Sequence, residues 1–402
     1  MPLESLATTT SSKPGAPDFS LVLGGPLFQI YRRARLSGDA LELATRRILV
    51  ISLFAWLPLA ILSLVEGHAF RGADRIPFLY DVEAYARFLV ALPVLIGAEL
   101  VVHRRVSPCV AKFVERRIVT DEDMPQFNGA VHSALRIRNS VTAEMALIFF
   151  VYTLGLWLWR NQIALGNATW YGTPSDGHLN LTLAGYWYRL VSIPILQFIL
   201  LRWYLRLAIW FRLLWRISRL NLQLSAAHPD RSGGIRFLGG TSYAFGPLLF
   251  AQGALLSGVI GNRVLFEGRG LVSFKLEAAG LIVGMVSIIL GPLLMFAPKL
   301  ELAKRKGAAD YGLLASCYIA GFERKWIRGG SPDMDELLGT GDIQSLADLG
   351  NSYSVVQDMR WVPFGISDIT RLVATTAAPM IPLGLTVFSL EDLVKRLIKI
   401  VL

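Results

Sequence analysis

Charged side chains inside long apolar stretches are the residues of this sequence whose types and spacing suggest chemistry. Glu99, Glu144 and Arg202 each lie one or two helical turns from the arginine-rich end of such a stretch. An unpaired charge at membrane depth costs on the order of several kcal/mol, so such side chains face the interior of a helix bundle. We therefore predict a buried ionic cluster of Glu99, Glu144 and Arg202, with Arg206 one turn further along and His103 at its edge.

Two interpretations of this cluster remain open. The charges could pair to hold the helices together, or they could form a working ion or proton site. Two carboxyl groups in one low-dielectric site favour proton uptake by one of them. A voltage sensor is disfavoured, because the arginines that follow Arg202 do not recur at every third residue and most lie beyond the apolar stretch.

Four uncharged polar residues near the middle of apolar stretches are candidates for lining a pore. Polar side chains at that depth either bond to neighbouring helices or border a wet path. The four candidates are Gln197, Gln252, Ser287 and Thr375.

The segment 228–234, His-Pro-Asp-Arg-Ser-Gly-Gly, is a candidate loop for an anion or a lipid headgroup. Successive glycine amides beside an arginine can cradle an anion. The alternative is an ordinary turn, opened by proline and aspartate and completed by glycines with positive φ. The tripeptide 228–230 after a basic helix resembles the signature loop of J-domain co-chaperones, but an apolar span follows it here, which speaks against that role. The candidates are His228, Asp230, Arg231, Gly233 and Gly234.

The elements that position these residues are predicted to be membrane-spanning helices. Hydrophobic residues make up 53% of the chain and charged residues 17%, where a soluble domain has about a quarter charged residues. Seven apolar stretches come close to the ~20 residues that cross a bilayer as a helix. They are Ile48–Val65, Phe88–Val102, Val141–Trp159, Leu190–Ile209, Phe245–Ile260, Leu276–Ala297 and Leu372–Phe388. The predicted fold is an all-α polytopic bundle with short amphipathic cytoplasmic helices.

The distribution of basic residues predicts the orientation. The net charge of +10 comes from lysines and arginines that flank the spans, above all after the second, fourth and sixth. This placement indicates anionic lipid headgroups rather than nucleic acid as the counter-charge. Cationic loops lie in the cytoplasm, so the N-terminus is predicted to be cytoplasmic. The arginine-rich, lysine-poor composition favours a bacterial inner membrane.

Four segments are expected along the chain. Residues 1–46 form a flexible tail, with Phe19–Phe28 as an interfacial segment on the membrane, and 47–298 a membrane domain of six spans. Residues 299–366 form cytoplasmic helices, and 367–402 the seventh span and an amphipathic C-terminal helix. Pro379 and Pro382 leave two possibilities for that span: a full crossing, which its length favours, or a broken or re-entrant segment.

Small residues in the spans predict close helix contacts. Gly280 and Gly284 form a GxxxG pair, and Gly253 with Ser257 a second small-residue pair. Spans five and six are therefore expected to pack against each other or across a subunit boundary in a homo-oligomer. The two cysteines are far apart in the chain, so neither a disulfide nor a cysteine-based metal site is expected. No motif for a nucleotide, a metal or a cofactor is found.

Three classes of function remain. The favoured one is a channel or secondary transporter for an ion or small solute, because of the charge cluster, the polar residues in the spans and the proline-broken seventh stretch. The first alternative is a non-transporting scaffold or sensor that signals through its cytoplasmic helices. The second is a lipid-modifying enzyme using His228 and Asp230, which ranks last because the sequence lacks a carboxylate cluster for a metal-bound diphosphate.

Overall fold

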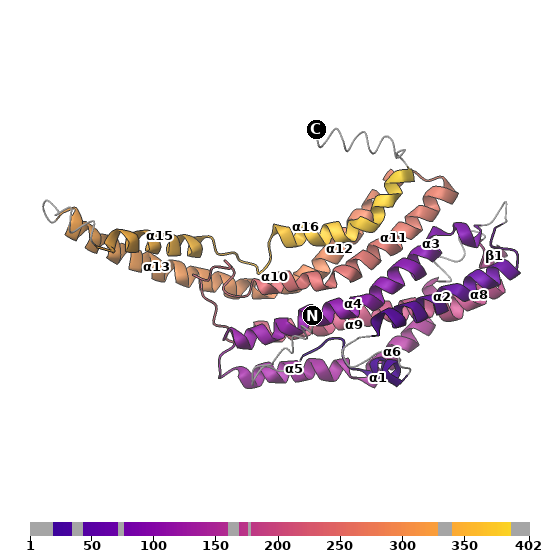
Figure 1. Ribbon diagram of the computed structural model, residues 1–402, viewed down its shortest axis with the longest axis horizontal. Coiled ribbons are helices and arrows are strands. Elements are labelled where there is room, and N and C mark those ends of the chain that lie inside the picture. Colours follow the sequence, from indigo (N-terminus) through magenta and orange to yellow (C-terminus); the bar gives the residue numbers. More distant parts are fainter. Residues whose placement is uncertain are drawn as a thin grey trace, which may run out of the picture.

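The computed structural model describes residues 19–33, 43–70, 76–159, 169–175, 178–328 and 340–386, and these residues are almost entirely helical (Figure 1). The α-helices of the first half are α1 (Pro26–Arg33), α2 (Ala44–Val65), α3 (Val82–Tyr85), α4 (Leu92–Glu115), α5 (Met124–Arg138), α6 (Val141–Phe150), α7 (Leu156–Trp159), α8 (Leu183–Trp187) and α9 (Ile193–Ser218). Those of the second half are α10 (Phe237–Ser242), α11 (Gly246–Glu267), α12 (Lys275–Leu290), α13 (Ala297–Trp326), α15 (Asp342–Gln357) and α16 (Ile366–Ala377). A two-stranded antiparallel hairpin, β1 (Gly172–Ser175) and β2 (His178–Leu181), lies at one end of the bundle.

Five helical rods are long and apolar enough to cross a membrane. They are Ala44–Val65, Val82–Glu115, Leu183–Ser218, Phe237–Glu267 and Leu271–Trp326. The chain is thus a multi-pass helical membrane protein, but the predicted number of seven spans is not confirmed. The third predicted span is a shorter apolar helix, Val141–Gly155. The seventh changes after α16 into a 3₁₀-helix, Ala378–Thr386, which contains Pro379 and Pro382.

Four of the five rods, all but the first, are much longer than the apolar stretches from which they were predicted. Two of these four position the buried charges described below, and we call them the two long rods. Val82–Glu115 has 34 residues and Leu183–Ser218 has 36, or roughly 50 Å each at 1.5 Å per residue. A hydrocarbon core is only about 30 Å thick. Their C-terminal parts therefore extend beyond the bilayer, where α5 packs along α9. Phe113 and Phe127 are fully buried in this extension, which the sequence analysis did not anticipate.

Both long rods contain a π-helical segment directly before a proline. Residues Ala86–Ala91 precede Leu92 and Pro93, and Tyr188–Ser192 precede Ile193 and Pro194. Proline has no N–H and its ring clashes with the carbonyl one turn earlier, so a widened turn lets the helix continue. These prolines therefore reshape the rods without ending them.

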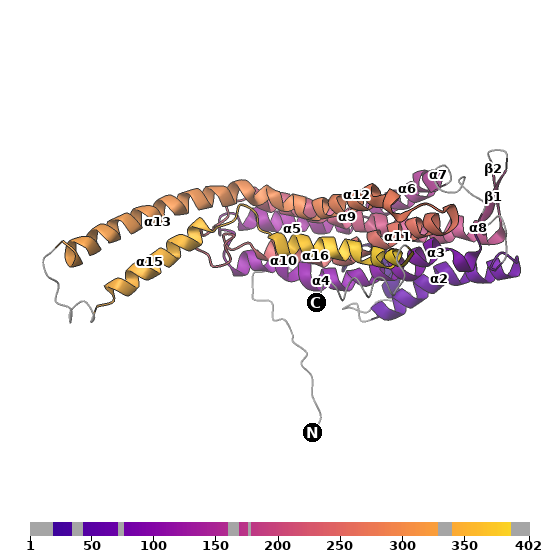
Figure 2. The ribbon, with the colours of Figure 1, turned by 90° about the horizontal axis from the view of Figure 1, so that it is seen from above.

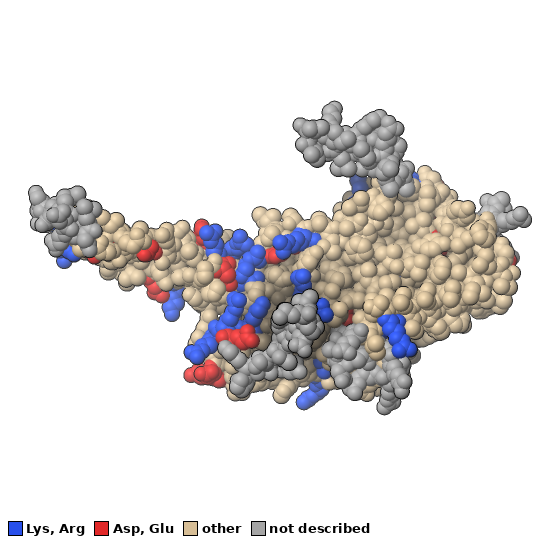
Figure 3. All heavy atoms as spheres, viewed as in Figure 1, with Lys and Arg blue, Asp and Glu red and all other residues tan. Residues whose placement is uncertain are grey.

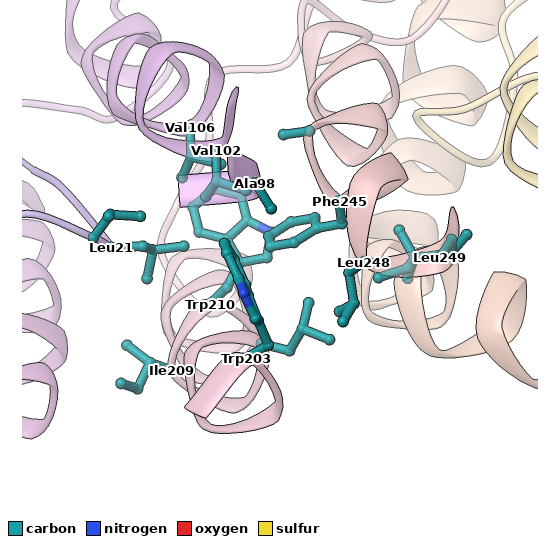
Figure 4. Packing of buried hydrophobic residues seen from close by; sticks show 14 of the residues in the cluster. Leu21, Ala98, Val102, Val106, Trp203, Ile209, Trp210, Phe245, Leu248 and Leu249 are labelled. Atoms are coloured by element: carbon teal, nitrogen blue, oxygen red, sulfur yellow. The ribbon is translucent and has the colours of Figure 1, made fainter. Parts of the chain in front are cut away.

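Tryptophans of α9 fill the space between α4 and α11 (Figure 4). Trp203 is 1% exposed, and its indole N–H donates to the Leu95 carbonyl of α4 at 2.9 Å. Trp210 lies about two turns further along the same face of α9, among Val102 and Val106 of α4 and Leu21 of the N-terminal segment (Figure 4). Large rings at these positions set the spacing between the long rods.

The N-terminal segment does not lie on the membrane surface, as the sequence suggested, but inside the protein. Phe19, Leu21 and Val22 are each 1% exposed, and the ring centroid of Phe19 lies 6.4 Å from that of Trp210. The prediction of an interfacial segment was wrong for these residues, because an apolar strip can be covered by protein as well as by lipid. The helix that follows, α1, is more exposed.

The small residues of α11 pack against α16 instead of α12. The Thr376 carbonyl leaves no room for a side chain at Gly253, and the Ser257 hydroxyl donates to the Pro379 carbonyl at 2.8 Å. Span five therefore contacts the seventh segment more extensively than it contacts span six, and a contact across a subunit boundary stays a prediction. A Cβ at Gly280 or Gly284 would meet nothing within 4 Å.

The last span continues out of the bundle as an arm. α12 runs through a 3₁₀ segment (Gly291–Phe296) into α13, and α15 folds back along α13 (Figures 1 and 2). Lysines and arginines gather where the arm leaves the bundle, and the surface from there toward β1 and β2 is mostly uncharged in this view (Figure 3). We call this the basic end and the opposite one, which carries β1 and β2, the hairpin end.

Candidate functional site

Five charged side chains from four helices meet inside the bundle, about midway along the two long rods; we call them the arginine cluster. They are Arg47 of α2, Glu99 of α4, Glu144 of α6, and Arg202 and Arg206 of α9. Each is less than a tenth exposed. Glu99 and Arg202 lie roughly 26 and 29 Å along their rods from Val82 and Leu183, which is the far edge of a ~30 Å hydrocarbon core.

Glu99 is the centre of the cluster, because it contacts all three arginines. Its Oε1 accepts from Arg206 Nη2 at 2.7 Å and from Arg202 Nη1 at 3.3 Å. Its Oε2 lies 2.5 Å from Arg47 Nη2. One carboxylate therefore joins three cations from two further helices, α2 and α9.

Glu144 ties the cluster to the N-terminal segment. Its Oε1 accepts from Arg202 Nε at 3.1 Å, and its Oε2 accepts from the Leu27 amide at 2.8 Å. Ser20 of the same segment lies with its Oγ 3.0 Å from His103 Nδ1. The structure thus brings Glu99, Glu144 and the two α9 arginines together and places His103 against the segment that covers them.

Arg47 is the member that the sequence analysis missed. It was counted among the basic residues that flank the first span, yet it is 1% exposed. Its guanidinium carbon lies 5.0 Å from the centroid of the Tyr31 ring. Its Nε and Nη1 have no hydrogen-bond partner among the described residues. The one available signal was its place at the same membrane level as Glu99.

The cluster carries excess positive charge around a small cavity. Three arginines and two glutamates leave one net positive charge. The cavity of about 10 Å³ is bordered by the three arginines, by the Glu99 carboxylate and by Tyr31, a volume close to that of one water position. Burial, and next the Glu99 carboxylate, raise the pKa of Tyr31 to about 12, so its phenol stays protonated.

The four candidate pore-lining residues do not form one path. Gln197 and Gln252 border a hollow of about 350 Å³, which is otherwise lined by Arg87 and by apolar side chains of α9, α11 and α12. Gln252 donates to the Tyr204 hydroxyl at 2.7 Å, and Gln197 to the Gly155 carbonyl at 3.4 Å. Ser287 is exposed on α12, and the Thr375 hydroxyl donates to the Arg371 carbonyl of its own helix at 2.7 Å.

The loop 228–234 wraps around its own aspartate. Asp230 accepts from the amides of Ser232 at 2.8 Å, Gly234 at 3.0 Å and Arg236 at 3.2 Å. Its Oδ1 also lies 3.0 Å from His228 Nδ1. Arg231, Gly233 and Gly234 have positive φ, as a tight turn requires. An internal carboxylate therefore occupies amides that were expected to face an external anion, which favours the alternative of a turn.

A second buried polar group, which the sequence analysis did not predict, lies at the hairpin end; we call it the aromatic cluster. Asp81 accepts from Trp170 Nε1 and Asn262 Nδ2, each at 2.7 Å, and from the Ala84 amide at 3.1 Å. Arg87 pairs with Glu83 and donates to the Tyr188 hydroxyl. The i, i+4 spacing of Glu83 and Arg87 was a signal for their pairing. The members of the aromatic cluster are Asp81, Glu83, Arg87, Trp170, Tyr188 and Asn262.

Other chemistry finds little support in the part of the chain that the structure describes. That part contains no group of three or more metal-ligating His, Cys, Asp or Glu side chains. Cys109 is buried, Cys317 is exposed, and both are free thiols. Comparison of the chain with protein-family models, curated proteins and solved structures found no match. The fold and the arginine cluster therefore define a multi-pass membrane protein with a buried, positively charged site.

Proposed function

We propose that this protein moves a small ion across a bacterial inner membrane, as a channel or secondary transporter, and that the arginine cluster is part of the ion's path. The observation that carries the proposal is the burial of five charges from four helices with one positive charge left over. Intramembrane charges are rare and mark ion pathways, proton relays or ligand sites.

Transport through this cluster requires a change of conformation. The N-terminal segment closes the cluster toward the basic end through the Leu27 amide and Ser20, and only about 10 Å³ is left inside. The described seventh segment offers a movable part, because its helix changes type at Ala378. We place the basic end and the N-terminus in the cytoplasm. We also propose that outward-facing Gly280 and Gly284 contact a second copy.

Ion flux into liposomes that contain the purified protein tests this proposal. We expect flux from the wild type and severalfold lower flux from Glu144→Gln, which loses one ion pair but keeps the acceptor for the Leu27 amide. Glu301→Gln is the matched control, because Glu301 forms an exposed pair with Arg305 on the arm. Folded wild type without flux of any cation, anion or proton would contradict the proposal, and so would equal flux in Glu144→Gln.

A scaffold or sensor is the second candidate, and the arm favours it. α12 and α13 form one rod from the membrane to the tip of the arm, so movement of the span reaches the tip. Leu302, Leu313 and Leu314 are each more than half exposed on α13. A spin label on exposed Cys317 would report arm movement, while buried Cys109 stays unlabelled. Arm movement in protein that carries no flux would favour this candidate. A lipid-modifying enzyme is disfavoured, because the Asp230 carboxylate already accepts hydrogen bonds from the amides of its own loop.

A further inference from the structure

We propose that the arginine cluster binds one monovalent anion of halide size in the cavity beside Arg47. This inference deepens the proposed function, since it names the class of the transported ion. The site is distinct from the loop 228–234, whose amides already hold Asp230.

The charge of the cluster calls for an anion. Glu99 and Glu144 neutralise two of the three buried guanidinium groups, and the third remains without a counter-charge among the described residues. An uncompensated charge in a low-dielectric interior is costly, whereas a bound ion of opposite sign removes the cost. The same excess charge repels cations. Water could fill the space but would leave the charge unbalanced.

The donors for such an anion are present and unused. Arg47 is 1% exposed, and its Nε and Nη1 donate to none of the described residues. Its Nη2 is held 2.5 Å from Glu99 Oε2. This contact fixes the planar guanidinium and hence the direction of the N–H bonds on Nε and Nη1. A fixed guanidinium with free N–H groups is a strong anion receptor.

The size of the cavity selects the anion. About 10 Å³ admits one particle of water size. Fluoride matches that size, and chloride fits after a small shift of the Arg47 or Tyr31 side chain. Nitrate, sulfate and phosphate groups have several heavy atoms and do not fit. Ile96 and Ile199 form the apolar part of the wall, which keeps bulk water away from the bound ion.

Anion-dependent unfolding of the full-length protein in detergent tests the site. We expect fluoride and chloride to raise the midpoint of thermal unfolding saturably above that in gluconate, at constant ionic strength and pH. Nitrate and sulfate should leave it unchanged. In Arg47→Gln, which makes the cluster neutral, the halide effect should disappear, while Arg305→Gln on the arm should retain it. A halide effect that persists in Arg47→Gln, or an equal effect of sulfate, would overturn the proposal.

Direct binding keeps the test decisive if Arg47→Gln folds poorly. Arg47→Lys retains the charge but loses the planar donor pair, so we expect chloride affinity to fall by about tenfold, or 1.4 kcal/mol. Unchanged affinity in Arg47→Lys would refute the role of the guanidinium. The flux assay separates the two proposals. Halide binding without any flux would refute transport and leave the site, whereas cation flux without halide binding would refute the site and leave transport.

Discussion

The arginine cluster and the aromatic cluster lie on the same two long rods, the first about midway along them and the second at their hairpin end, and they hold their buried charges differently. In the aromatic cluster, Asp81 receives three neutral donors and Arg87 pairs with Glu83 one turn away. In the arginine cluster, the partners come from four helices, positive charge is in excess and Arg47 keeps unused donors. Each cluster has one unbalanced charge, negative in the aromatic cluster and positive in the arginine cluster. The Asp81 carboxylate already accepts three hydrogen bonds, whereas Arg47 keeps unused donors beside a cavity, so the arginine cluster has capacity for a ligand.

The two clusters also differ in the part of the protein that covers them. Trp170 packs edge-on against Phe78 and Tyr188 at centroid distances of 4.9 and 5.1 Å, so the aromatic cluster lies under a rigid ring layer. The arginine cluster is covered by the N-terminal segment, whose residues 19–25 have no regular secondary structure and which is held by hydrogen bonds of Ser20 and Leu27 and by the buried side chains of Phe19, Leu21 and Val22. We expect the first to be static and the second to open.

Glu99→Gln should have the largest effect. It leaves three buried guanidinium groups with one carboxylate, and breaking a buried ion pair from one side costs about 3–5 kcal/mol. We expect the free energy of unfolding, measured by denaturant titration in detergent, to fall by that amount. Glu301→Gln on the exposed arm should change it by less than about 1 kcal/mol. An unchanged value for Glu99→Gln would mean that the charges are hydrated in solution.

Asp81→Asn should have a smaller effect. The shape stays, but an amide has one acceptor oxygen, so either the Trp170 bond on Oδ2 or the Asn262 and Ala84 bonds on Oδ1 are lost, and the bonds that remain lose their charge assistance. We expect a loss of about 1–3 kcal/mol. Trp170→Phe removes one of those bonds, and the double variant should lose less than the sum of the two single losses. A loss larger than that of Glu99→Gln would reverse the comparison between the clusters.

Ser20→Ala should loosen the cover of the arginine cluster. It removes the contact with His103 and the acceptor for the Val22 and Leu23 amides, at a cost of about 1 kcal/mol. We expect faster hydrogen exchange over residues 19–27 with little change at the hairpin end. Ser316→Ala, on the exposed arm, is the control. Equal exchange in both variants would show that the cover is held by apolar packing alone.

Acid should have the smallest effect, at the tip of the arm. The Lys325 ammonium, and next the Trp326 indole N–H, hold the pKa of Asp342 below its usual value. A lowered pKa in the folded state gives stability above the usual aspartate pKa, and this stability is lost as the pH falls through the lowered one. Relative to the intrinsic exchange rate at each pH, hydrogen exchange at the end of α13 and the start of α15 should therefore rise on acidification. Asp342→Asn should remove this pH dependence. Exchange that is independent of pH in the wild type would contradict the pair.

Depth along each helix was enough to predict which charges meet. Glu99, Glu144 and Arg202 are at one level in their apolar stretches, and a charge in a bilayer must find a partner at that level. Arg47 escaped this logic because a basic residue at the start of a span reads equally well as an interfacial anchor. Trp170 and Asn262 carried no signal, since neither their loop position nor their type indicates Asp81 as a partner.

The amino-acid sequence by itself determined that the chain crosses a membrane as helices and that Glu99, Glu144 and Arg202 share one depth, because hydropathy and helical rise are local properties. Only the tertiary structure decided that α11 packs on the seventh segment, that the N-terminal strip is covered by protein, and that three arginines surround a cavity with one charge to spare. Those outcomes depend on contacts between residues far apart in the chain, where shape complementarity rather than composition selects the partner.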